Sequence, residues 1–140
     1  MTDSAMGPKG GVAPYLTIRE RQASQAAEWY GRAFGAREQA RMPAEDCVRL
    51  MHCHLEINSG SVMLADDFPE FHGLMDAPMP SGVTLHLEVD DADAWWARAV
   101  SAGAEPRMEL HDAFWGARYG QLRDPFGHTW SVSSPSRRVR

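Results

Sequence analysis

Apolar side chains recur along two segments of the chain at the spacing of an amphipathic helix. In residues 22–35, and again in residues 91–103, apolar residues stand at positions i, i+3, i+4, i+7 and i+8, which gathers them on one helical face. The two series are offset by 66 positions. Each segment runs into a glycine suited to a helix C-terminus, Gly35 or Gly103, and the aspartates at 90–91 suit the N-cap of the second helix.

Apolar and polar residues alternate before and after each helical segment, as they do in half-buried strands. The predicted strands are residues 12–18, 37–42, 49–57 and 61–66 in the first half, and residues 83–89, 106–112, 117–123 and 128–133 in the second. The order strand, helix, three strands therefore occurs twice. We expect an α+β fold of two βαβββ modules.

The modules cover about residues 12–66 and 83–134 of a single domain, and a proline- and glycine-rich loop, residues 67–82, joins them. A loop of this length inside a small domain is either a linker or a functional lid. Residues 1–11 are predicted to be a flexible leader and residues 135–140 a flexible tail, because neither carries a periodic apolar pattern.

The alternation also assigns faces to two of the strands, because side chains on one face of a strand recur every second residue. The apolar residues of strands 49–57 and 83–89 should pack on the helices. The opposite face then carries two polar sets, which are His52, His54 and Glu56 on one strand and Thr84, His86 and Glu88 on the other. In a strongly curved sheet these side chains line a cup, and otherwise they are solvated.

Composition and charge narrow the range of partners. The chain has 140 residues, of which 44% are hydrophobic and 24% charged, as in ordinary globular domains, and its net charge of −5 disfavours nucleic acid as a partner. The absence of a long apolar run or a secretory signal in this sequence favours a cytoplasmic protein without a membrane partner. Two cysteines, Cys47 and Cys53, fit a reducing compartment. The basic residues of the tail are expected to be solvated.

Two modules of this length, together with several short motifs, resemble the vicinal oxygen chelate superfamily, which includes glyoxalase I, bleomycin-resistance proteins and extradiol dioxygenases. More narrowly, the motifs are similar to those of its PhnB-like branch. They are Ala27-Glu28-Trp29-Tyr30, Ala33-Phe34-Gly35-Ala36, Ser101-Ala102-Gly103-Ala104, Phe114-Trp115-Gly116-Ala117-Arg118-Tyr119-Gly120 and Asp124-Pro125-Phe126-Gly127-His128-Thr129-Trp130. The resemblance implies a cupped, mixed, eight-stranded sheet and a homodimer.

Enzymes of this superfamily commonly hold a divalent metal with histidine and glutamate side chains from particular strands. The resemblance maps three of those positions to Ala13, Thr84 and Ser131. Alanine has no donor atom, and neutral hydroxyls are weak ligands for Zn²⁺ or Fe²⁺. We therefore expect no metal at the usual positions and no cofactor, with a divalent metal possible at a displaced site.

The histidines and glutamates of the predicted cup allow three interpretations. Imidazole and carboxylate at alternate strand positions can supply a displaced metal site built on His52, His54 or His86. A histidine beside a carboxylate can also act as a general acid or base next to a carbonyl. The third interpretation is that these side chains bond to neighbours and only shape a polar pocket.

The segment around Trp115 adds the groups that would grip a ligand. Its aromatic rings suit stacking on a planar molecule, and Arg118 suits binding of an anion or an ion pair with a carboxylate such as Asp124. Residues 67–82 are long and apolar enough to close over the cup. The predicted ligand-binding residues are His52, His54, His86, Trp115 and Arg118.

Three functions remain open from the sequence. The chain can be a ligand-binding protein of the glyoxalase and bleomycin-resistance type, including a drug-sequestering resistance protein, which needs a cleft but no catalytic residue. It can be an enzyme, either a metal-dependent lyase or dioxygenase with a displaced site or an acid–base catalyst. It can also be a structural dimer without a ligand. The small-molecule ligand and the catalytic residues stay unassigned.

Overall fold

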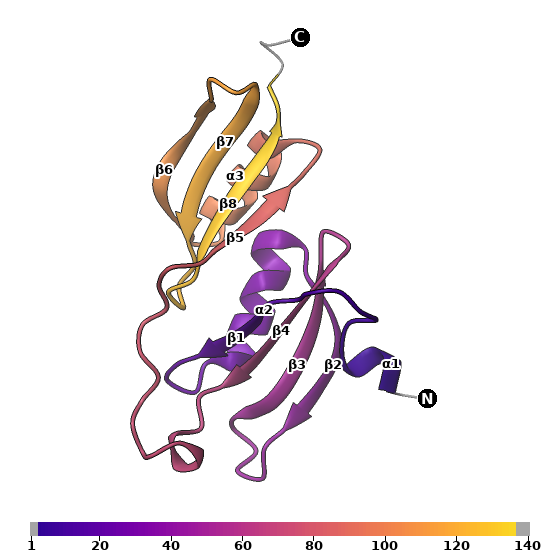
Figure 1. Ribbon diagram of the computed structural model, residues 1–140, viewed down its shortest axis with the longest axis vertical. Helices are drawn as coiled ribbons and strands as arrows, with labels where there is room; N and C mark the ends of the chain where they lie inside the picture. Colours follow the sequence, from indigo (N-terminus) through magenta and orange to yellow (C-terminus); the bar gives the residue numbers. More distant parts are fainter. Residues whose placement is uncertain (1–2, 137–140) are drawn as a thin grey trace. The chain divides into compact units, whose positions relative to one another are not determined.

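The chain folds into two compact units, each built on a four-stranded mixed sheet (Figure 1). The computed structural model describes residues 3–136, so the arginines of the predicted tail lie outside the described residues. Unit 1 contains the described residues up to Gly31 and residues 35–78, and unit 2 contains residues 32–34 and the described residues from Met79 onward. Among the helices described, none is long and apolar enough to cross a membrane.

Unit 1 holds the first βαβββ module, preceded by a short helix. Its elements are α1 (Asp3–Met6), β1 (Tyr15–Ile18), α2 (Ala23–Phe34) except for its last three residues, β2 (Arg37–Pro43), β3 (Leu50–Ile57), β4 (Gly60–Asp66) and the 3-10 turn η1 (Pro69–Phe71). The strand order is β1-β4-β3-β2. Strand β1 runs parallel to β4, and the other two pairs are antiparallel.

Unit 2 repeats this topology. Its elements are β5 (Thr84–Glu88), α3 (Ala92–Ser101), β6 (Glu105–Asp112), β7 (Ala117–Arg123) and β8 (Thr129–Pro135). The strand order is β5-β8-β7-β6, with β5 parallel to β8 and the other pairs antiparallel. Helix α3 packs on β6, β7 and β8, and therefore covers one face of this sheet. The expected α+β class with two βαβββ modules is confirmed.

The helix ends follow the expected residues with one shift. Gly35 caps α2 in the left-handed conformation with φ 68°, which glycine adopts without strain. The side chain of Asp91 caps α3 by accepting a hydrogen bond of 3.2 Å from the Ala94 N–H. At the other end of α3, Ala102 is the C-cap in a right-handed conformation, and Gly103 with φ 113° comes one residue later.

The predicted alternation separates an apolar face from a polar face in both sheets. In β3 the side chains of Cys53, Leu55 and Ile57 are buried, and in β5 Leu87 is buried. The prediction fails at the start of each strand. Val83 is 71% exposed because β5 begins one residue after it, and Met51, the second residue of β3, is 41% exposed. The histidines of β3 and β5 consequently belong to the face opposite the apolar one.

Gly120 of β7 allows α3 to lie close to its sheet. A Cβ atom at this position would come within 2.6 Å of the Trp96 side chain and 3.0 Å of the Leu110 Cα. Any larger residue would push the helix away, because atoms that close must move apart. Gly120 therefore fixes which face of β7 meets the helix, and Tyr119 beside it faces the other way.

The last strand of each module fastens the start of the module's helix. In unit 1, the Asp66 carboxylate is 4% exposed and accepts hydrogen bonds from the Ala23 N–H at 3.0 Å and the Leu50 N–H at 2.6 Å. In unit 2, the Ser134 hydroxyl accepts one from the Ala92 N–H at 3.1 Å. The first turn of a helix has unpaired N–H groups, so these contacts satisfy buried donors and set where each helix begins.

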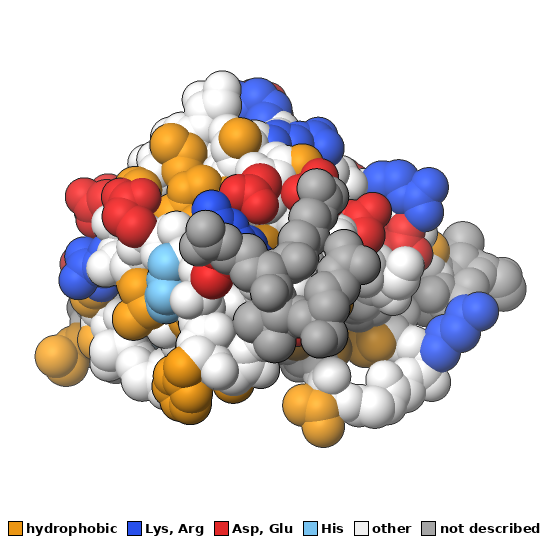
Figure 2. Space-filling model, turned by 90° about the horizontal axis from the view of Figure 1, so that it is seen from above, with side chains coloured by type: hydrophobic (Ala, Val, Ile, Leu, Met, Phe, Trp, Pro, Cys, Tyr) orange, Lys and Arg blue, Asp and Glu red, His pale blue; other side chains and the backbone are white. Residues whose placement is uncertain are grey.

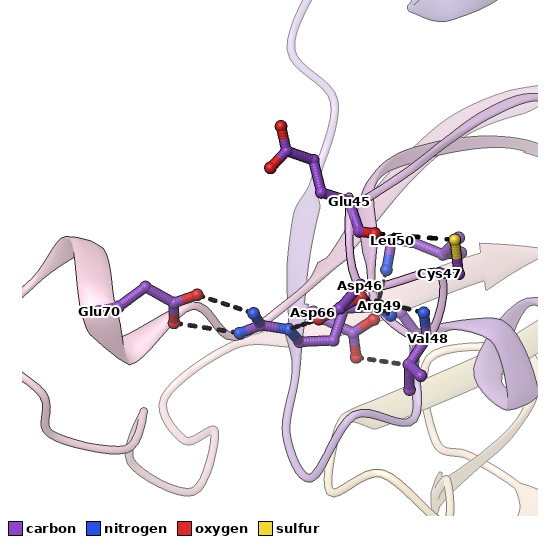
Figure 3. A network of polar contacts seen from close by, with 9 residues as sticks. Glu45, Asp46, Cys47, Val48, Arg49, Leu50, Asp66 and Glu70 are labelled. Atoms are coloured by element: carbon purple, nitrogen blue, oxygen red, sulfur yellow. Dashed lines mark hydrogen bonds and ion pairs between the residues drawn. The ribbon is translucent and has the colours of Figure 1, made fainter.

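The loop after β4 is tied to its own unit by arginines. Arg49 donates to both carboxylate oxygens of Glu70 at 3.0 and 2.7 Å and to Asp46 at 2.6 Å (Figure 3). Its guanidinium also lies 4.2 Å from the centre of the Phe68 ring. Arg19 holds the far end of this segment through the carbonyl oxygen of Ala77. The predicted closure of residues 67–82 over a ligand stays a prediction.

Replacing the buried carboxylate tests the fastening of the helix to the sheet. We expect Asp66→Ala to lower the free energy of unfolding by about 2 kcal/mol, because two buried N–H donors lose their acceptor. Urea denaturation measures this change, and Asp76→Ala, at an exposed carboxylate of the same unit, is the matched control. Equal stability of the two variants would contradict the assigned role of Asp66.

Candidate functional site

His86 of β5 lies between two polar partners on the sheet face opposite α3. Its Nε2–H donates to the Glu88 carboxylate at 2.9 Å, and in the neutral ring its Nδ1 then accepts from the Ser131 hydroxyl at 2.6 Å. The strand register explains this, because His86 pairs with Ser131 of β8 and Ser131 pairs with Gln121 of β7. We call His86, Glu88, Tyr119, Gln121 and Ser131 the polar face of unit 2.

Aromatic rings continue from His86 along this face. The His86 and Tyr119 rings are stacked with centroids 6.4 Å apart, and the Trp115 ring meets Tyr119 edge-on at 5.5 Å. The Tyr119 hydroxyl accepts a hydrogen bond from the Gln121 amide at 2.8 Å. Trp115 is 56% exposed. We call Trp115, Tyr119 and His86 the aromatic row, and it brings together two of the five predicted ligand-binding residues.

Arg118 lies apart from the aromatic row. Arg118 stands two residues before Gly120 in β7, so its side chain lies on the same face of the sheet, which is the face that α3 covers. Its guanidinium donates to Asp93 of α3 at 3.1 Å and lies 3.8 Å from Asp112, and the hydrogen bond to Asp93 raises its pKa. The expected ion pair therefore exists, but with these two carboxylates and not with Asp124.

Asp124 has a local structural role instead. Its carbonyl oxygen accepts from the Gly127 N–H at 3.1 Å, which closes the expected turn. Its carboxylate accepts from the backbone N–H groups of Phe126 and His128 and, at 2.8 Å, from the indole N–H of the buried Trp130. This motif of the sequence thus shapes the turn between β7 and β8.

His52 and His54 of β3 form a second polar face, in unit 1. The Nδ1 of His52 lies 2.8 Å from the Tyr15 hydroxyl, and the Nε2 of His54 lies 2.9 Å from the Ser61 hydroxyl. Burial raises the pKa of the Tyr15 phenol, and a smaller contribution comes from Cys53. We call Tyr15, His52, His54, Glu56 and Ser61 the polar face of unit 1.

The leader covers part of this face. Helix α1 lies against β2 and β3, and the carbonyl oxygens of Ala5 and Met6 contact His54 and His52. A cavity of about 580 Å³ remains between the leader and the sheet. It is lined by Gly7, Pro8, Lys9 and Gly10 of the leader, by Val12 and Ala13 just after it, and by Gln39, His54, Glu56, Ser59, Gly60 and Ser61.

The residues at the mapped metal positions do not fit a divalent metal. Ala13 has no donor atom, and the Ser131 hydroxyl is bonded to His86. Within the described residues there is no group of three or more histidine, cysteine, aspartate or glutamate side chains that could hold a metal ion. Metal binding at a displaced site built on His52, His54 or His86 stays a prediction.

Acidic and basic side chains intermingle on the face of the molecule shown in Figure 2, and hydrophobic side chains stand there in separate groups. Among the described residues on this face, the Lys and Arg side chains form no broad basic surface of the kind that binds nucleic acid. The net charge of −5 on the whole chain favours attraction of cations over anions.

Comparison with known proteins identifies the family. The family model described as Glyoxalase/Bleomycin resistance protein/Dioxygenase superfamily matches residues 13–132. The chain belongs to this superfamily. It is 41% identical over 139 residues to the protein Mb0911c of Mycobacterium bovis, a match that covers 96% of this chain and 90% of that protein.

Two solved structures share the fold of this chain. Protein PA1353 from Pseudomonas aeruginosa is similar with a TM-score of 0.73 and 26% identity, over 91% of this chain and 99% of that one. A PhnB protein from Bacillus cereus has a TM-score of 0.70 at 12% identity, over 89% of this chain and 99% of its own, and at that identity the likeness concerns the fold alone. The resemblance to the superfamily, with PhnB-like neighbours, is confirmed.

Some residues of the two polar faces were not among the predicted ligand-binding residues. Tyr15 and Gln121 stand at alternate positions in strands β1 and β7, so the same alternation that selected the histidines could have selected them. The contact of the leader with His52 and His54 had no such signal, because residues 3–11 carry no periodic pattern.

The two cysteines should differ sharply in reactivity. Burial, with a smaller contribution from Glu38, raises the pKa of the Cys53 thiol to about 11, whereas Cys47 is exposed. At neutral pH, far below this pKa, Cys53 is protonated, so we expect iodoacetamide to label Cys47 alone in the folded protein. Mass spectrometry of tryptic peptides measures this, and labelling of both cysteines at equal rates would contradict the burial of Cys53.

Proposed function

We propose that this superfamily member binds a small planar organic molecule on the polar face of unit 2, with its flat part against the aromatic row. The observation that carries the proposal is the continuous series of rings from Trp115 through Tyr119 to His86, with Trp115 56% exposed. Aromatic faces attract planar groups, and an amphipathic tryptophan at the surface presents a large contact area.

The charge of the site supports a cationic ligand. The Glu88 side chain is 65% exposed at the end of the aromatic row and accepts the His86 N–H. A cation above the rings would gain from their negative faces and from this carboxylate. Arg118, the nearest expected anion binder, is instead paired with Asp93 on the other side of the sheet.

Acid–base catalysis at the same face is the second candidate. Ser131, His86 and Glu88 form a continuous chain of hydrogen bonds, which fixes the orientation of the imidazole. Such a chain can pass a proton to or from a bound carbonyl compound. Binding without reaction, as a sequestering protein needs, requires only the aromatic row, so the binding proposal does not depend on catalysis.

Three of the predicted ligand-binding residues, His52, His54 and Arg118, do not belong to the polar face of unit 2 and are not part of the proposed site. His52 and His54 belong to the polar face of unit 1, and their part in binding a ligand stays a prediction. A part for Arg118 in binding a ligand also stays a prediction. We expect Arg118→Gln to bind a planar cation as tightly as the wild type, because the Arg118 guanidinium lies toward α3.

A thermal-shift screen of planar organic cations, with proflavine as the first probe, tests the binding proposal. We expect wild-type protein to be stabilised, and Trp115→Ala and Tyr119→Ala to bind about tenfold more weakly, because each removes a ring from the stack. Glu88→Gln should weaken binding of the cation but not of an uncharged analogue of the same shape.

His72→Ala is the control variant for this screen, since His72 is an exposed histidine of unit 1 paired with Asp67. It should bind proflavine as the wild type does. An unshifted melting temperature across the whole screen, or equal affinity in the wild-type and Trp115→Ala proteins, would rule the proposed site out.

We also propose that the protein forms a homodimer. Each four-stranded sheet has two edge strands, and edges are normally paired or covered. The aromatic residues of α2 do not supply the interface, because Trp29 and Tyr30 are buried within the chain itself. Light scattering at micromolar concentration should give about twice the chain mass of 15.6 kDa. A mass equal to that of one chain would refute the dimer.

A further inference from the structure

The leader makes its main polar contacts with two histidines of β3. The Ala5 carbonyl oxygen lies 2.8 Å from the Nδ1 of His54, and the Met6 carbonyl oxygen contacts the Nε2 of His52. Both histidines are on the same side of β3, two residues apart. Consecutive carbonyl groups of the leader are therefore held by neighbouring imidazole rings.

These contacts fix which ring nitrogens carry a proton. A carbonyl oxygen only accepts, so the His54 Nδ1 and the His52 Nε2 must donate. The opposite nitrogens then accept from hydroxyl groups in the neutral rings, which are those of Ser61 at 2.9 Å and Tyr15 at 2.8 Å. The two imidazoles thus present two oriented N–H donors toward the leader.

Besides these contacts and the packing of α1 on β2 and β3, the described residues of the leader have few features that hold it in place. Helix α1 has four residues, far fewer than an isolated helix needs to be stable. Gly7, Gly10 and Gly11 follow it, and Gly11 adopts φ 75°, so the chain can turn there at low cost. Val12 is fully exposed and anchors nothing.

The face under the leader already has the form of a small-molecule site. The cavity of about 580 Å³ reaches His54 and is bounded on the leader side by Lys9. Glu56, the only carboxylate among the described residues that line it, is engaged in an ion pair with Arg37. The free charge of the cavity lining is then that of the Lys9 ammonium, which favours an anion.

We propose that residues 3–11 form a displaceable strap over the polar face of unit 1, and that a carboxylate-bearing small molecule takes the place of the strap's carbonyl oxygens on His52 and His54. Carboxylate oxygens are stronger acceptors than peptide oxygens, so they compete well for the same N–H donors. This site is separate from the aromatic row and does not rest on the function proposed for unit 2.

The sequence offers a direct probe, because Lys9 is its only lysine. Endoproteinase Lys-C can therefore cut the full chain at one place, within the strap, and mass spectrometry follows release of the first nine residues. We expect slow cleavage in the wild type and about fivefold faster cleavage in His52→Phe and in His54→Phe, since each loses one hydrogen bond to the strap.

His111→Phe is the matched control, because His111 also bonds a backbone carbonyl, that of Glu109, but in unit 2. Its cleavage rate should equal that of the wild type. Wild-type cleavage that is fast and insensitive to His52→Phe and His54→Phe would overturn the strap.

Succinate is the probe for the ligand. In the wild type it should accelerate cleavage at Lys9 saturably, relative to chloride at equal ionic strength, and this acceleration should disappear in the His52→Phe/His54→Phe double variant. Imidazole ¹⁵N spectra of the wild type give an independent reading, free of any folding defect in a variant. The spectra should show a protonated Nδ1 in His54 and shifts of His52 and His54 with succinate. No difference between succinate and chloride by either measurement would overturn the carboxylate site.

Discussion

The structure depends on one constraint, which is that side chains of a strand alternate between the two faces of its sheet. In unit 2, α3 covers one face and takes up the apolar half of each strand, so every polar residue with the other parity must lie on the opposite face. His86 and Ser131 meet there because β5 and β8 are in register. The location of the candidate site is therefore a consequence of core packing.

Hydrogen bonds near the ends of the last strands fix the position of each helix relative to its own sheet. Asp66 and Ser134, each near the end of its module's last strand, bind the first N–H of the helix that covers the sheet. A shift of the strand by one residue would bury polar side chains and break these hydrogen bonds together. Gly120 adds a steric condition, because only glycine lets Trp96 approach β7. The contacts that stabilise each unit therefore also determine which residues lie on its polar face.

Most of the fold followed from the sequence because its signals are local. Helical periodicity, strand alternation and capping residues gave both modules, and the observed helices Ala23–Phe34 and Ala92–Ser101 lie inside the predicted ranges. Only part of the candidate site could be predicted from the sequence. His86 and Trp115 meet through Tyr119, but Arg118 does not join them, although the alternation of β7 already groups it with Gly120 and Leu122.

The contact of the leader with His52 and His54 could not be predicted from the sequence. It joins a segment without a periodic apolar pattern to a strand almost fifty positions away, and it uses backbone carbonyl oxygens that every residue possesses. No residue type marks such an acceptor. Only the three-dimensional course of the chain reveals that the donors of the two imidazoles are already engaged.

The measurement that tests the central claim most directly is the indole N–H spectrum of the protein during titration with proflavine. The five tryptophans report separately, and Trp29 and Trp130 are buried at 3% and 1% exposure, whereas Trp115 is exposed. If the aromatic row binds the planar cation, the Trp115 signal moves first and furthest, and those of Trp29 and Trp130 stay in place. Saturable shifts that leave the Trp115 signal unchanged would place binding elsewhere and contradict the account.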